Sequence, residues 1–379
     1  MSGEITAIKA LDSVIDICRF IGITLVVIGH SGCPQIIKSW IYLFHMSLFF
    51  ALSGYCYSKR YDDHPIDYFT KKVKTIYLPY VVFSIGLILF HNLFISIGLY
   101  GSSESFLLLE NGNEYGIIPF YSARELVKQI VRTMLFASNE EFGGATWFLR
   151  ILFIVNIFYN FFRFLAKNYL KFDDNRIFVS SVIIGVLALF LGCGCDYYNI
   201  HLPLELQTCF SAFFAFEVGV VFKKITDKAK TKNCILLSIS TCLALLALTH
   251  FGSIGLGLNS VGEPWFYFAA TILGLLFTYS TSIFIQKKIT GKMVQCFVLI
   301  GKHSLSIVFY HFMAFKIVTL FQILLTNGDY IHLGCFPVCN THGMWWTVYS
   351  LAGMLVPISI AIIWGKVRNG FKNAKRKKC

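Results

Sequence analysis

Residues 11–32 read LDSVIDICRFIGITLVVIGHSG, and this stretch decides the fold. Apart from a few polar side chains it is an apolar run of about 20 residues, the length that an α-helix needs to cross a bilayer. The run begins late for a secretory signal, and no small-residue cleavage site follows it. We therefore expect a retained first membrane span.

Nine further apolar runs follow, so the sequence predicts an all-α, polytopic transmembrane bundle of about ten spans. No internal repeat or low-complexity linker divides the chain, and we expect residues 1–379 to form a single membrane domain. The expected spans lie near 14–32, 39–58, 76–99, 147–166, 177–193, 204–222, 234–251, 264–286, 303–326 and 344–365.

The composition excludes a soluble globular protein. Of 379 residues, 56% are hydrophobic and 14% charged, with a mean hydropathy of +0.65, whereas soluble domains carry about 25% charged residues. The net charge of +13 would suit nucleic acid only if Lys and Arg formed a basic face on a soluble module. They lie between the apolar runs instead, so lipid is the expected partner and nucleic acid is not.

The basic residues also predict the topology, because short cytoplasmic loops accumulate Lys and Arg. With the N-terminus inside, the expected inner segments hold 25 of the 33 Lys and Arg residues, and the expected outer segments hold four. Both termini are then expected to be cytoplasmic.

The long outer connection, residues 100–146, contains SARELVKQIVRTMLF. Its apolar residues recur at helical spacing opposite charged ones, which is typical of an amphipathic helix lying at the membrane interface. Such a helix either covers an outward-facing site or merely closes a long loop.

The 12 cysteines are scattered through apolar runs and connections, which does not indicate a disulfide scaffold. The pairs Cys193/Cys195 and Cys335/Cys339 have no His-rich partner at zinc-finger spacing. The sequence therefore favours small buried hydrophobic side chains, and no metal site is expected.

The first span holds Asp16, Arg19 and His30 within one expected helix. Charged groups inside a span are costly and usually mark an ion pair, a cavity or a substrate path. Asp16 and Arg19 are three residues apart and can pair. Arg19 and His30 are eleven apart, which places them within about 20° on one face and about 16.5 Å apart along the axis. A neutral His at that position can take a proton from a hydroxyl; the alternative is a purely structural Arg and His.

The segment DICRFIGITLVVIGHS at 16–31, followed by FHMSLFFALSGY at 44–55, resembles the opening of the acyltransferase-3 family of membrane acyltransferases, in particular its fucose 4-O-acetylase-related branch. Ser47 stands where that family often has Pro. Four further segments agree with the resemblance, which covers nearly the whole chain: FTKKVKTIYLPY at 69–80, TWFLRILFIVNIF at 146–158, FAFEVGVVFKK at 214–224 and IGKHSLSIVFYHF at 300–312.

The resemblance implies an enzyme that takes an acyl group, usually acetyl, from acetyl-CoA on the cytoplasmic side and places it on a hydroxyl of a surface polysaccharide or its lipid-linked precursor. His30 matches the family's catalytic histidine and Arg19 the arginine that serves the acyl donor. No bound cofactor is implied beyond the donor substrate. The implied location is the inner, plasma membrane of a bacterium.

Other polar residues are candidates for donor or substrate binding. The lysines near the third span would meet the coenzyme A phosphates, although positive-inside topology alone also accounts for them. Trp147 could stack on a sugar or anchor a span, Glu217 is expected to pair with a basic residue, and Lys316 with either an internal carboxylate or the donor. The full set of binding candidates is His45, Lys71, Lys72, Lys74, Trp147, Lys302, Ser304 and His311.

Two other function classes remain open from the residues alone. A polytopic transporter or flippase for a polar solute or glycan also lines its path with buried Arg, His and Lys, but no internal symmetry or pair of broken helices is visible in the sequence. The other class is a non-catalytic scaffold. It does not explain the polar cluster of the first span, because charged groups inside a span are costly and usually functional.

Overall fold

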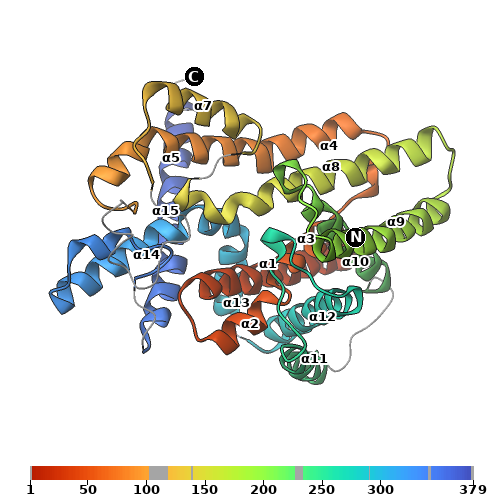
Figure 1. Cartoon of the computed structure of the whole chain (residues 1–379). Helices are drawn as coiled ribbons and strands as arrows, with labels where there is room; N and C mark the ends of the chain where they lie inside the picture. The colour runs from red at the N-terminus through yellow and green to blue at the C-terminus, as the bar shows by residue number, and fades with distance from the viewer. Residues whose placement is uncertain are drawn as a thin grey trace.

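The computed structural model describes residues 2–101, 118–137, 140–226, 234–289, 291–339 and 343–376, and within these ranges it holds helices and no strands. Figure 1 shows the helices as one bundle. The α-helices are α1 (Ser2–His30), α2 (Gln35–Tyr42), α3 (His45–Tyr55), α4 (Pro65–Lys72), α5 (Leu78–Ser96), α7 (Ala123–Met134), α8 (Trp147–Asn168), α9 (Asp174–Tyr197), α10 (Gln207–Thr226), α11 (Cys234–Leu248), α12 (Pro264–Lys288), α13 (Gly291–Lys302), α14 (Ser304–Thr326) and α15 (Trp345–Arg376).

Nine helical segments in the described ranges are long and apolar enough to cross a membrane, which confirms the all-α polytopic bundle and nine of its expected spans. They are Asp12–His30, Gln35–Tyr55, Pro65–Ser96, Glu141–Asn168, Asp174–Tyr197, Pro203–Thr226, Pro264–Lys288, Ser304–Thr326 and Trp345–Val367.

The run expected to span near 234–251 is shorter than predicted. It forms α11, which has 15 residues and rises only about 22 Å, whereas the hydrocarbon core is about 30 Å thick. α11 packs along α12. Residues 227–233, which precede it, lie outside the described ranges.

The second span is broken, where the sequence predicted a continuous helix. α2 ends at Tyr42 and α3 begins at His45. The ring of His45 bridges the break, because its Nδ1 donates to the carbonyl of Ile41 at 2.9 Å. Ser47, at the position where the family often has Pro, lies in the first turn of α3, where Pro is tolerated.

The third helical segment begins at Pro65, well before the expected start near residue 76, and contains a π-helical turn at Val73–Tyr77. Pro79 follows this turn, in the first turn of α5. Proline has no N–H to donate to the preceding turn, so the helix there widens into a π-bulge instead of continuing its regular bonding. The bulge places the lysine-rich turn within a continuous helix.

α1 lies in the middle of the bundle, where it contacts α2, α3, α12, α13, α14 and α15 (Figure 1, red). Its approach to α13 requires Gly301, because a Cβ at this position would lie 1.9 Å from the carbonyl oxygen of Asp16. α3 and α10 approach as closely at Gly219, whose Cβ would lie 1.8 Å from the carbonyl oxygen of Ala51. These contacts fix the helices that carry the polar residues.

The amphipathic segment of the long connection forms α7. Ser122 caps it by accepting a hydrogen bond from the backbone N–H of Glu125 (3.3 Å), and the helix packs against α5. Val127 and Val131 are exposed, as the apolar face of an interfacial helix would be. Its position relative to lipid stays a prediction, and residues 102–117 of the connection lie outside the described ranges.

Candidate active site

The polar residues of the first span form a cluster around Asp16. Arg19 Nη1 donates to Asp16 Oδ1 at 2.7 Å, and Lys302 Nζ lies 3.9 Å from Asp16 Oδ2. Arg19 Nη2 also lies 3.5 Å from the Sγ of Cys56. The Asp16 side chain is 7% exposed and that of Arg19 37%, so the buried carboxylate holds a guanidinium that remains accessible.

Arg19 lines a cavity of about 350 Å³ between α1, α3, α4, α8 and α14. Three other residues singled out from the sequence line the same cavity: Lys71, Lys72 and Ser304. Its described lining contains three cations and no carboxylate, which makes it a suitable environment for an anionic group such as a phosphate.

Aromatic rings support the two cavity lysines. Lys71 Nζ lies 5.2 Å from the ring centroid of Tyr61, and Lys72 Nζ lies 5.1 Å from that of Tyr68. Cation–π contacts of this kind hold the charge while leaving the ammonium protons available to a ligand. Lys74 is exposed and is not part of the cavity lining.

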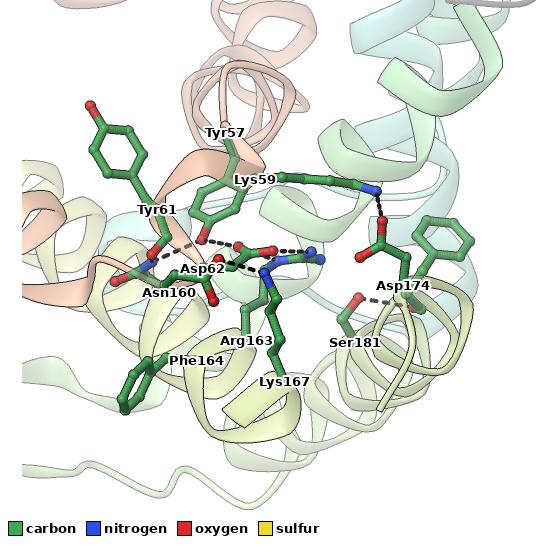
Figure 2. A network of polar contacts seen from close by, with 12 residues as sticks. Tyr57, Lys59, Tyr61, Asp62, Asn160, Arg163, Phe164, Lys167, Asp174 and Ser181 are labelled. Atoms are coloured by element: carbon green, nitrogen blue, oxygen red, sulfur yellow. Dashed lines mark hydrogen bonds and ion pairs between the residues drawn. The ribbon is translucent and has the colours of Figure 1, made fainter. Parts of the chain in front are cut away.

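A buried polar network fixes the turn that leads into α4 (Figure 2). Arg163 donates to both carboxylate oxygens of Asp62, at 2.9 and 2.7 Å, and Tyr57 donates to Asp62 at 2.9 Å. Asn160 donates to the hydroxyl of Tyr57 and to the carbonyl of Tyr61. Because Tyr61 supports Lys71, the network positions one wall of the cavity. Nothing in the sequence links Asp62 with Arg163.

Two histidines meet beyond the cavity. The ring centroids of His30 and His311 lie 5.7 Å apart, and Phe312 packs against His30 at 5.1 Å. His311 Nδ1 lies 2.9 and 3.0 Å from the carbonyls of Ile307 and Val308, so Nδ1 carries the proton. Its buried Nε2 is then an acceptor, and it has no hydrogen-bond partner.

His30 and His311 are not part of the cavity lining, but the helices that carry them are. Arg19 of α1 and Ser304 of α14 line the cavity, as does Val308, one turn before His311. Because His30 and His311 also meet, α1 and α14 run in the same direction. About 16.5 Å along α1 separates Arg19 from His30, so the cationic and imidazole groups lie at two depths of the bundle.

His45 lies near the same pair. It is buried, stands 4.9 Å from Tyr42 between ring centroids, and is an electrostatic neighbour of His30 together with His311 and Lys38. The sequence placed His30 and His45 on separate spans. The structure brings His30, His45 and His311 together.

The comparisons with known proteins identify the family of the chain. A family model described as an acyltransferase domain, that of the acyltransferase-3 family, matches residues 12–364. The chain belongs to the acyltransferase-3 family. It is therefore a multi-pass membrane acyltransferase. No curated protein and no solved structure matches it.

In this acyltransferase-3 protein the remaining candidates lie elsewhere. Trp147 is not part of the cavity lining and packs beside Gly257. Lys316 is buried, 3.7 Å from Glu141 and bonded to the carbonyls of Leu333 and Cys335. Of the two partners left open by the sequence, Lys316 thus takes an internal carboxylate.

Glu217 does not form the expected ion pair. It accepts a hydrogen bond from Ser181 at 3.4 Å, because Arg163, its cationic neighbour, is already bonded to Asp62. Glu217 is therefore a structural residue between α9 and α10.

A larger cavity, of about 580 Å³, opens where α9 ends and α12 begins. Its described lining includes Asp196, Glu263 and Trp265 but none of the catalytic or binding candidates predicted from the sequence. The cavity beside Arg19 is the candidate site of this acyltransferase-3 protein because of the charge of its lining, not because of its size.

Proposed function

We propose that the protein transfers an acetyl group from acetyl-CoA to a hydroxyl of a surface polysaccharide or its lipid-linked precursor, in the plasma membrane of a bacterium. The observation that carries this proposal is the cavity lined by Arg19, Lys71 and Lys72, with the contacting pair His30 and His311 on two of the helices that also line it. The cations suit the phosphates of coenzyme A, whose long arm then reaches toward the histidines. The resemblance to fucose 4-O-acetylase-related enzymes supports a sugar as acceptor.

In the proposed reaction His30 is the general base. It takes the proton of the acceptor hydroxyl while the oxygen attacks the thioester carbonyl carbon. A C–O ester bond forms, the C–S bond breaks, and the coenzyme A sulfur leaves with the proton that His30 held. The Nε2 of His311, an acceptor without a partner, orients either the His30 ring or the incoming hydroxyl.

The test measures transfer of label from radiolabelled acetyl-CoA into a surface polysaccharide extract, using membranes that contain the protein. We expect His30→Ala to lower the rate by about 10²- to 10⁴-fold, the usual contribution of a general base. His201→Ala, at an exposed position away from the cavity, is the matched control and should retain the rate.

Full activity of His30→Ala would exclude the proposed mechanism. Absence of transfer by the intact protein, with an acceptor-rich extract supplied, would exclude this donor and acceptor. The transport of a polar solute or glycan would then be the function to test.

A further inference from the structure

The connection between α14 and α15 contains a cluster that the acyl-transfer chemistry does not use. Within the described part of the chain, His332, Cys335 and Cys339 form the one group of His, Cys and acidic residues whose ligand atoms could together hold a metal ion, all within 4.8 Å of one another. His332 lies in a short 3-10 turn, Tyr330–Gly334, and the cysteines follow it. The sequence indicated only small buried hydrophobic side chains here, because His332 was not associated with them.

One ligand atom of this cluster is not satisfied by the protein around it. The Nδ1 of His332 is buried and has no hydrogen-bond partner. Cys335 and Cys339 are both free thiols.

We propose that His332, Cys335 and Cys339 bind a metal ion, and that the ion is Zn²⁺. One imidazole and two thiolates are a donor set that zinc prefers, with a fourth tetrahedral position left for water or another ligand. Tetrahedral bonds of about 2.3 Å place two sulfurs about 3.8 Å apart. The ligand atoms lie within 4.8 Å of one another, so the distances between them need to shorten by only about 1 Å to bind zinc.

The charge balance agrees with this assignment. Two thiolates neutralise Zn²⁺, and binding releases two thiol protons to solvent. The neighbouring Lys316 is already balanced by Glu141 at 3.7 Å. The occupied site adds no net charge to this partly buried region.

The proposed ion would hold the connection against the active-site histidines. Lys316 donates to the carbonyls of Leu333 (3.0 Å) and Cys335 (2.8 Å), which anchors the connection on α14. Phe336 packs on Phe312 with ring centroids 4.6 Å apart, and Phe312 packs on His30. Zinc is thus expected to stabilise the connection that packs behind His30, and not to act as a catalyst.

The test measures the zinc content of the full-length protein by inductively coupled plasma mass spectrometry. The protein is purified in detergent without chelators. We expect about one equivalent per chain, lost in the Cys335→Ser/Cys339→Ser double variant. Cys193→Ser/Cys195→Ser is the matched control, because it removes two thiols outside the cluster and should retain the metal.

A second measurement needs no variant and so does not depend on how the variant folds. Co²⁺ is added to wild-type protein after chelator treatment, and we expect sulfur-to-cobalt charge-transfer absorption that Zn²⁺ removes. A Cys335–Cys339 disulfide, seen as two thiols that alkylate only after reduction, would overturn the proposal. Free thiols that take up neither metal would overturn it as well.

Discussion

At the scale of the residue, Arg19 is a charged group within a span that is paired and still accessible to a ligand. The buried Asp16 pairs with Arg19 and lies 3.9 Å from the exposed Lys302, and Arg19 lines the cavity. The pairing fixes its orientation, while partial exposure leaves donors for a ligand. Arg19 is therefore expected to bind the donor without taking part in proton transfer.

Replacement of Arg19 by Ala should raise the KM for acetyl-CoA by about 10- to 100-fold with a smaller change in kcat, because a hydrogen bond to a charged group contributes about 1.5–3 kcal/mol. The KM of Arg19→Lys should lie between those of the unchanged protein and of Arg19→Ala, since Lys keeps the charge but loses the bidentate geometry. Initial rates over a range of donor concentrations measure both constants. An unchanged KM would show that Arg19 is only structural.

At the scale of the element, α13 decides where Lys302 stands. This helix packs against α1 through Gly301 and a stacked pair of rings, Phe20 and Phe297, at 4.5 Å. The sequence did not predict α13 as an element, because its 12 residues are too few to span a membrane. Its close contact with α1 is what brings Lys302 to Asp16.

Gly301→Ala should destabilise the protein by about 1–3 kcal/mol, because the added Cβ overlaps the backbone of α1 and forces the two helices apart. Gly291→Ala lies on the same helix with nothing within 4 Å of the added Cβ and should leave the stability unchanged. The thermal midpoint in detergent, followed by aggregation or intrinsic fluorescence, compares the two. Equal midpoints would mean that α13 is not held where the structure places it.

At the scale of the whole molecule, the orientation in the membrane is a prediction from the distribution of Lys and Arg. With the connection at 327–344 outside and that at 169–173 inside, Tyr330→Cys should react with a membrane-impermeant maleimide in intact cells. Tyr169→Cys should react only after permeabilisation. Both side chains are exposed, at 61% and 71%, so reactivity reports the side of the membrane rather than burial. The opposite pattern would reverse the topology and separate the cationic cavity from cytoplasmic acetyl-CoA.

Composition and the lengths of the apolar runs were enough to predict the helical membrane class and most of the spans. Both depend on local properties: the length of an apolar run sets whether a helix can cross a bilayer, and helical geometry alone puts Asp16, Arg19 and His30 on one helix at known depths. The short length of α11 and the break in the second span were not predicted. Hydropathy does not indicate where a helix ends within an apolar run.

Which residues meet depends on how the helices pack. His311 reaches His30 because α1 and α14 are in contact. Lys71 and Lys72 reach the Arg19 cavity because α4 forms part of its wall. The grouping of His332 with Cys335 and Cys339 likewise depends on how the chain turns after α14. Contacts between distant segments are set by packing shape, such as the close approach at Gly301, and this information is not carried by the pattern of any one segment.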